Sequence, residues 1–287
     1  MTIPIIYFHI GSSQTLPQSI SVVRHFNNNA FLLGNLASQP YAIEGGISFV
    51  DVADHWDGVP EFAGDFVNMS SNSPNIELIC IARWMVIYNF LVSSGFRTAL
   101  YVDSDVLFFA NAGYIYKALF GGHKFTLSHG TSGHTMFLET EFLGKFVEYF
   151  TEIYRLKTGI EWENLVFKYQ SRQKYGLNGG VCDMTLLRNY SLGENSQYVD
   201  EITRIRRLDN KLVSFDDNIN SSDSVFVMDD RRIKSIEFDK AGSPTGKRLD
   251  YEEPIHFLSL HFQGPAKQYC SEIYNEWSSR VERMPWR

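Results

Sequence analysis

The segment that decides the fold is residues 98–109, which read TALYVDSDVLFF and place two aspartates between two apolar runs. The first run, residues 98–102, is typical of a buried strand, and a helix is expected before it over residues 73–94. That helix begins with a serine N-cap and a proline and stops at Gly95, which are common start and stop signals. With a strand expected at residues 4–10, the order strand, helix, strand predicts a Rossmann-type sheet.

The whole chain predicts a single α/β domain over residues 1–287, with a mixed sheet flanked by helices. It contains no internal repeat, no low-complexity run and no linker composition, and residues 194–220 are polar without a clear period. Further strands are expected at residues 31–33, 47–52, 125–129 and 255–261, a strand pair at 224–228 and 233–238, a loop at 240–248, and helices at 17–26, 141–156 and 267–281.

Composition argues against several classes of protein. The chain has 26 basic and 33 acidic residues, and a nucleic-acid-binding protein would need a basic face. Its three cysteines are scattered without a CxxC pair, which is typical of a reducing compartment and not of a disulfide scaffold or a zinc site. The most apolar window, residues 76–92, contains charges, so we expect a buried helix and no transmembrane segment. With no signal-peptide pattern at its start, the chain is expected to be cytoplasmic.

The two aspartates after the strand at residues 98–102 form the strongest chemical signal. Asp103 and Asp105 flank Ser104, and side chains two residues apart on an extended segment point the same way. Two converging carboxylates repel each other unless a hard cation lies between them, and Mg²⁺ or Mn²⁺ carrying a diphosphate suits such a pair. The alternative interpretation is a polar strand end. Phosphatases of the haloacid-dehalogenase type also use this pattern, but on their first strand.

A second signal lies at residues 260–267, which read LHFQGPAK. A neutral imidazole at His261 would complete a site of two aspartates and one histidine for the metal ion. Gly264 lets the backbone approach a phosphate closely, and Lys267 supplies a point charge for a diphosphate. The alternative is an ordinary strand-end histidine near a turn.

These motifs together resemble the signatures of retaining glycosyltransferases of the GT-A fold, family 8 in particular. Residues 177–181 (LNGGV) and 215–220 (FDDNIN) resemble two further stretches of that family, in the family's order. The chain departs from the family in Gln268 and Tyr269, which stand where Pro-Trp is usual, and in the turn after the first strand. That turn contains His9 and Gly11 and lacks the usual acidic residues, yet we expect it to contact the nucleotide.

The resemblance implies roles for further residues. It places Arg83 where the helix before the aspartates reaches the donor, although Arg83 could instead pair with Glu77 or a buried carboxylate. It implies that Asn178 contacts donor or acceptor hydroxyls, or serves its own turn. Asp216 and Asp217 would bind sugar hydroxyls or stabilise positive charge at the anomeric carbon; the alternative is an ordinary pair of loop aspartates.

The resemblance also implies an activity. We expect a transferase that moves a hexose from a nucleotide diphosphate sugar, UDP-linked in most such enzymes, to a hydroxyl of a glycan, glycolipid or protein, with retention. Residues 1–110 would form the nucleotide-binding half, and residues 111–287 the acceptor-binding half that supplies the metal-binding histidine. Peripheral membrane association through residues 277–287 stays open. The alternatives are a catalytically silent sugar-nucleotide-binding protein and a phosphohydrolase with Asp103 as nucleophile.

Overall fold

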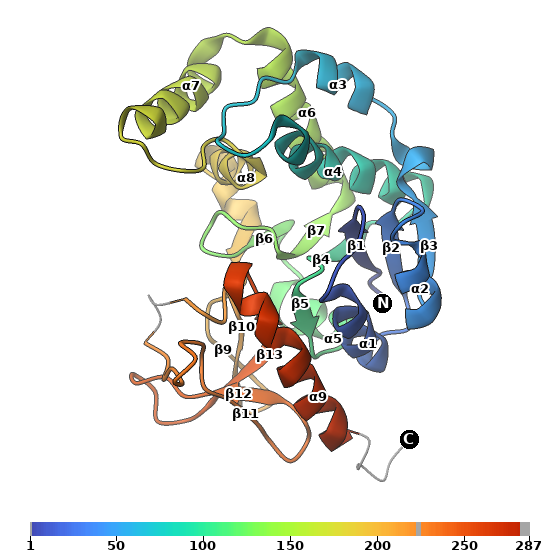
Figure 1. Cartoon of the computed structure of the whole chain (residues 1–287), viewed down its shortest axis with the longest axis vertical. Coiled ribbons are helices and arrows are strands. Elements are labelled where there is room, and N and C mark those ends of the chain that lie inside the picture. Colours follow the sequence, from blue (N-terminus) through green and yellow to red (C-terminus); the bar gives the residue numbers. More distant parts are fainter. Residues whose placement is uncertain (1, 222–224, 282–287) are drawn as a thin grey trace.

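A computed structural model describes residues 2–221 and 225–281 of the chain. Its main feature is a mixed sheet with the strand order β3-β2-β1-β4-β7-β6-β8, in which β1 to β4 run parallel and β7 runs antiparallel to β4 (Figure 1). The predicted mixed sheet is therefore confirmed. Its strands are β1 (Ile5–His9), β2 (Ala30–Gly34), β3 (Ser48–Asp51), β4 (Thr98–Val102), β6 (Phe125–Leu127), β7 (Thr135–Glu139) and β8 (Val199–Glu201).

Helices cover both faces of this sheet, as expected, because each face presents a continuous apolar surface. One face packs against α3 (Val59–Asp65), α4 (Pro74–Ser93), α6 (Thr140–Leu156) and α8 (Asp183–Tyr190). The other packs against α1 (Leu16–Phe26), α2 (Gln39–Gly45), α5 (Ala112–Ile115) and the turn η2 (Tyr116–Phe120). The remaining segments include η1 (Val52–His55), η3 (Gly193–Tyr198) and α7 (Gly159–Lys174), which lies at the outer edge of the first layer (Figure 1).

A second, smaller sheet has the order β11-β12-β13-β10-β9, and β5 pairs with β13 at its side. The expected strand pair at residues 224–228 and 233–238 is confirmed only in part: Met228 and Lys234 form an antiparallel bridge and the Ser235 N–H donates to the Val227 carbonyl at 2.8 Å, whereas residues 222–224 lie outside the described part. Residues 236–238 pair instead with residues 244–246, which were expected as a loop. The strands are β5 (Val106–Phe108), β9 (Arg206–Leu208), β10 (Lys211–Phe215), β11 (Ile236–Phe238), β12 (Pro244–Gly246) and β13 (Ile255–His261).

The helix α4 begins as predicted, because the Ser73 side chain accepts a hydrogen bond from the Ile76 backbone N–H. Among the described helices, α4 alone is long and apolar enough to cross a membrane by length and composition, and half of its apolar window is buried inside the molecule. Its apolar residues pack against the sheet in the largest core cluster. This is the arrangement of a core helix.

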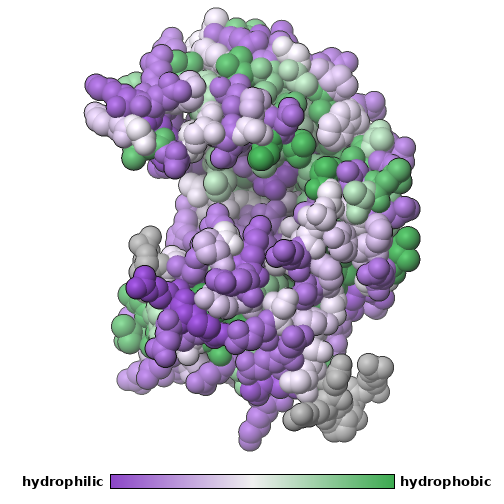
Figure 2. Space-filling model, in the orientation of Figure 1, coloured by the Kyte–Doolittle hydropathy of each residue, from purple (hydrophilic) through white to green (hydrophobic). Residues whose placement is uncertain are grey.

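The chain ends, within the described residues, in the turn η4 (Gly264–Tyr269) and the helix α9 (Cys270–Val281). Trp277 on α9 is buried in a third core cluster with β5 and β13, so it is not available as a membrane contact. The rest of the segment considered for membrane association, residues 282–287, lies outside the described residues. Figure 2 shows a deep notch between the part that carries α7 and α8 and the part that carries the second sheet.

Candidate active site

The candidate site lies where β1 and β4 end beside each other. The strand order reverses between these two neighbours, and open α/β sheets bind ligands at the carboxyl ends of strands beside such a switch point. A pocket of about 360 Å³ lies there. Six residues that the sequence singles out line it together, and the full lining is Phe8, His9, Ile10, Ile76, Ile79, Cys80, Arg83, Asp103, Ser104, Asp105 and Lys267.

Asp105 and His261 come from segments far apart in the chain and face each other. The strand β5 starts directly after Asp105 and pairs antiparallel with β13, with Val106 opposite His261. This register places the His261 Nε2 atom 3.6 Å from the Asp105 Oδ1 atom. From the turn η4, the Lys267 Nζ atom lies 3.1 Å from Asp105 Oδ2. The carboxylate therefore has a cation at one oxygen and an imidazole facing the other.

The His261 ring is held in one orientation. Its Nδ1 atom is hydrogen-bonded to the Asp217 backbone carbonyl, which can only accept, so Nδ1 is the protonated nitrogen. Burial and the neighbouring His134 ring lower the pKa of His261, which keeps the imidazole neutral at pH 7. Nε2 is then an acceptor that faces a second acceptor, the Asp105 carboxylate. A cation between two such atoms would satisfy both.

Asp103 belongs to a different cluster. Its Oδ1 atom accepts hydrogen bonds from the Tyr101 hydroxyl and from Arg83 Nη1, the latter at 3.1 Å. Arg83 also donates to the Tyr101 hydroxyl, at 2.9 Å, and its Nη2 atom pairs with the Asp183 carboxylate. The Trp84 indole N–H lies 3.3 Å from the same Asp183 oxygen. Arg83 thus pairs with two carboxylates, and neither is Glu77, one of the partners considered from the sequence.

The predicted metal-binding residues fit a divalent cation in part. Two carboxylates and a neutral imidazole form a donor set that Mn²⁺ accepts, and Mg²⁺ is held by carboxylates. Asp105 and His261 converge, whereas Asp103 is turned toward Arg83. Across residues 2–221 and 225–281, no three His, Cys, Asp or Glu side chains are arranged to hold a metal ion. Asp103 can join the other two only if its carboxylate leaves Arg83.

The Asp217 carboxylate lies near two histidines, and its backbone carbonyl contacts the His261 ring. Its carboxylate accepts a hydrogen bond from Ser128 and lies 3.5 Å from His129 Nε2 and 3.8 Å from His134 Nε2. Burial alone would raise the pKa of Asp217, but its contacts with His134 and Ser128 outweigh burial and lower it. Asp217 is therefore an ionised carboxylate, and its side chain is 29% exposed.

The other two residues expected near the sugar lie elsewhere. Asp216 is 1% exposed, and its carboxylate pairs with Lys234 and accepts a hydrogen bond from the His261 backbone N–H at 3.0 Å. In this arrangement Asp216 fixes the end of β13 and does not face the pocket. Asn178 is exposed on the turn between α7 and α8, where its backbone carbonyl accepts a hydrogen bond from Arg172 Nε at 2.8 Å.

Several of the remaining predicted residues shape the backbone around the pocket. Gly11 has a φ of +91° and donates its N–H to Asn35 Oδ1 at 3.0 Å. Gly264 has a φ of +58°, which an L side chain rarely adopts, and this turn carries the chain from β13 to Lys267. The Ser104 carbonyl accepts a hydrogen bond from the Thr15 hydroxyl at 2.9 Å.

His9 lies at the end of β1. Burial lowers its pKa, and its Nε2 atom is buried without a hydrogen-bond partner among the described residues. The ring is therefore neutral at pH 7, and it contributes no charge to the pocket.

The positions of three residues of this site do not follow from the sequence. Asp183 completes the Arg83 cluster, and no motif in the sequence marks it as a site residue. Tyr101 belongs to a segment that predicts a buried strand, and nothing in the sequence indicates that its hydroxyl contacts Asp103. The Gly-rich sequence before His134 is compatible with a flexible loop that closes over the acceptor or with a surface histidine, but His134 is 2% exposed and stacks on His261 with ring centroids 4.1 Å apart.

This architecture, a mixed sheet with an acidic pair at its switch point and a second sheet closing the edge, is a GT-A-type fold. Among solved structures, the chain is similar to the WbbM bifunctional glycosyltransferase, with a TM-score of 0.51 at 12% identity over 99% of this chain. The chain spans 50% of the length of the WbbM chain. This similarity confirms the predicted likeness to GT-A-type glycosyltransferases at the level of the fold.

Two further structures are less similar. The galactosyltransferase LgtC matches at a TM-score of 0.44 and 14% identity, with 99% of this chain and 98% of LgtC covered. Mouse xyloside xylosyltransferase 1 matches at a TM-score of 0.46 and 11% identity, with 70% of this chain and 85% of that chain covered. No protein-family model and no curated protein sequence matches the chain.

Proposed function

We propose that the chain is a metal-dependent glycosyltransferase that transfers a hexose from a UDP-sugar to an acceptor hydroxyl with retention of configuration. One observation carries the proposal. Two carboxylates, Asp103 and Asp105, and two cations, Arg83 and Lys267, line one pocket at the switch point of the sheet. The neutral His261 ring aims an acceptor nitrogen at Asp105 from the opposite sheet. This set suits a sugar linked to a diphosphate and a divalent ion.

In the proposed reaction, the bond between the anomeric carbon and the diphosphate oxygen breaks while the acceptor oxygen forms a bond to that carbon. Both events take place on one face of the sugar, so the departing phosphate can take the proton of the acceptor hydroxyl. Lys267 stabilises the negative charge that builds on the diphosphate. The ionised Asp217 stabilises the positive charge that develops at the anomeric carbon.

Asp105 and His261 would hold Mn²⁺ or Mg²⁺, and Asp103 would join them after leaving Arg83. When bound, the ion supplies further neutralisation of the leaving diphosphate. Arg83 then remains paired with Asp183, which keeps the guanidinium in the pocket and prevents it from following the carboxylate.

The test is metal-dependent hydrolysis of the donor. The full chain is incubated with UDP-glucose, UDP-galactose or UDP-N-acetylglucosamine in Mn²⁺, and UDP release is compared with that in EDTA. At least one donor is expected to release UDP only with the metal, and NMR of the released sugar is expected to show the donor's anomeric configuration first. Absence of UDP release from every donor in Mn²⁺ and in Mg²⁺ contradicts the proposal.

Two further measurements separate the alternatives. Thermal stabilisation by UDP and Mn²⁺ without any release of UDP would identify a silent sugar-nucleotide-binding protein. Release of phosphate from p-nitrophenyl phosphate would favour a phosphohydrolase. The structure gives the second alternative little support, because both Arg83 and Tyr101 hydrogen-bond the Asp103 oxygen that would have to attack.

A further inference from the structure

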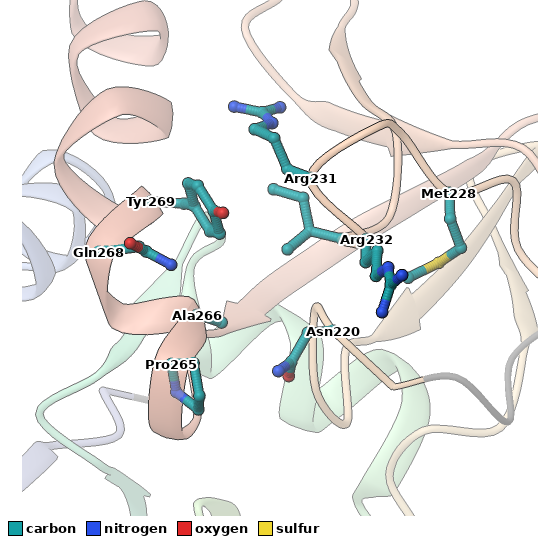
Figure 3. Close-up of a pocket in the computed structure, with 9 residues that line it drawn as sticks. Asn220, Met228, Arg231, Arg232, Pro265, Ala266, Gln268 and Tyr269 are labelled. Atoms are coloured by element: carbon teal, nitrogen blue, oxygen red, sulfur yellow. The ribbon is translucent and has the colours of Figure 1, made fainter.

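A second pocket lies on the other side of the turn η4. It has a volume of about 450 Å³, within the usual range for small-molecule sites. Figure 3 shows residues of η4 along one side, and Asn220, Met228 and Arg232 along the other. It is lined by Asn220, Met228, Arg231, Arg232, Ile233, Pro265, Ala266, Gln268 and Tyr269.

The two arginines of this pocket differ in their partners. The Arg231 guanidinium pairs with Asp229 at 2.5 Å and with Glu272 at 2.5 Å, and it lies over the Tyr269 ring. Arg232 makes no ion pair with any acidic side chain in residues 2–221 and 225–281. Figure 3 shows Arg232 extending toward Met228 and Arg231 extending away from it. The pocket therefore contains one guanidinium whose charge no described side chain balances.

The backbone holds Arg232 in place. Its φ is +62°, and its N–H donates to the Asp229 carbonyl at 2.9 Å, which closes a tight turn. The following Lys234 N–H donates to the Ile219 carbonyl at 2.7 Å and ties this turn to the segment that carries Asn220. The backbone that carries the Arg232 side chain is therefore fixed by hydrogen bonds.

The side chain of Asn220 is a second polar group on the pocket lining. The Oδ1 atom of Asn220 is buried and has no hydrogen-bond partner among the described residues. The walls beside it are largely apolar, formed by Ile233, Pro265 and Ala266. A cation and an amide within apolar walls suit a sugar ring whose apolar face packs on the wall while its polar groups reach the side chains.

The turn η4 separates this pocket from the proposed donor site. Lys267 faces Asp105 on one side of η4, while Ala266 and Gln268 line the second pocket on the other. Residues 217–220 also link the two sites, because Asp217 lies beside His261 and Asn220 lines the second pocket. The Ile219 N–H donates to the His261 carbonyl at 2.9 Å and holds this segment against β13. A molecule in the second pocket would therefore lie next to the site of transfer.

We propose that this second pocket binds an anionic group, a carboxylate or a phosphate, carried by the acceptor saccharide, with Arg232 as the residue that selects it. A guanidinium binds either group through paired hydrogen bonds, and Lys or a neutral side chain does not reproduce that geometry. This inference rests on the proposed glycosyltransferase function, because it names the class of acceptor.

The test compares three probes of similar size, methyl β-glucuronide, glucose 6-phosphate and the neutral methyl β-glucoside. Their binding to the full chain is measured by titration calorimetry, without donor. One or both anionic probes are expected to bind about tenfold more tightly than the neutral one, which is the size of one charge-assisted hydrogen bond. A tighter glucuronide identifies a carboxylate as the preferred group, and a tighter sugar phosphate identifies a phosphate.

Arg232→Gln is expected to abolish the preference for the anionic probes. The matched control Arg207→Gln is expected to keep it, because that guanidinium lies outside the pocket in an exposed pair with Glu253. Circular dichroism checks that both variants are folded. Equal affinities of all three probes, no binding of either anionic probe at millimolar concentration, or a preference that survives Arg232→Gln would each overturn the inference.

Donor hydrolysis, measured without acceptor, separates this inference from the proposed function. A chain that releases UDP but binds the three probes equally refutes the second pocket alone. A chain that discriminates the probes through Arg232 but never releases UDP refutes the transferase and supports an anion-binding pocket.

Discussion

Asp103 and Asp105 stand two residues apart, yet they lie in different surroundings. Asp103 is bonded to Arg83 and Tyr101, on the side of the sheet that α4 covers. Asp105 faces His261 and Lys267, which come from the second sheet and the turn after it. Asp103 therefore has an arginine and a tyrosine hydroxyl at one oxygen, whereas Asp105 pairs with Lys267 through one oxygen and with the other faces a neutral imidazole whose acceptor nitrogen needs a cation.

This difference shows that the acidic pair is shared between two layers of the molecule. A ligand that needs both carboxylates must draw Asp103 away from Arg83, whereas Asp105 is already in place. We therefore expect substitutions around Asp105 to affect activity with little effect on stability. Substitutions around Arg83 should affect stability first, because the charges there are buried and depend on one another.

The largest effect is expected for Asp105→Asn. The substitution removes a negative charge between His261 and Lys267, so UDP release in Mn²⁺ should fall about 10³-fold. Circular dichroism and urea unfolding should show a fold close to that of the wild type. The exposed Asp57→Asn serves as a control with the same chemical change. A folded Asp105→Asn variant that retains wild-type turnover would remove Asp105 from the site.

The sequence predicts the elements that position this site because their signals are local. The strand β4 and the helix α4 are continuous apolar segments with clear caps, and both form where they are expected. The helix α7 was not expected, although Trp162, Leu165, Val166 and Tyr169 recur at helical spacing and pack against the largest core cluster. The short strands β9 and β12 were not expected either, since each has only three residues and lies in a segment without a clear strand pattern, whereas β11 lies inside the strand expected at residues 233–238.

The residues of the candidate site differ in the same way in how far the sequence predicts them. Asp105, His261 and Lys267 lie in motifs that can be read one at a time, and the structure brings them together. The pairing of Arg83 with Asp183 could not be predicted, because neither residue carries a signal for the other and the contact depends on how α8 packs against α4. The burial of His134 depends likewise on β13, a strand far along the chain.

Asp183→Asn tests whether the cluster around Arg83 contributes mainly to stability. It leaves a buried guanidinium with Asp103 as its one remaining carboxylate, so the free energy of unfolding should fall by about 2 kcal/mol, less than for a pair broken outright. Urea unfolding measures this loss. The KM for the donor should rise more than kcat falls, because Arg83 would be positioned less firmly.

The control for this substitution is Asp250→Asn, which breaks an exposed pair with Arg248 and should change stability by less than about 1 kcal/mol. Equal stabilities of Asp183→Asn and the wild type would show that Arg83 does not depend on its second carboxylate.

Lys267→Met is expected to have a smaller effect. The Lys267 side chain is 49% exposed, so water screens its charge, and we expect kcat to fall about tenfold, less than the loss of a buried donor would cause. The matched control is Lys247→Met, at an exposed lysine on the far part of the second sheet. If the two variants turn over donor at the same rate, Lys267 does not stabilise the leaving diphosphate.

The smallest expected effect distinguishes two buried tyrosines. The Tyr101 hydroxyl joins Arg83 to Asp103, whereas the Tyr154 hydroxyl has no hydrogen-bond partner among the described residues. Tyr101→Phe should therefore lower the free energy of unfolding by about 1 kcal/mol, and Tyr154→Phe should leave it unchanged or raise it slightly. Urea unfolding of both variants measures the difference. If both substitutions cost the same, the Tyr101 hydroxyl does not hold Asp103 on the Arg83 side, and the contrast between the two aspartates would rest on Arg83 alone.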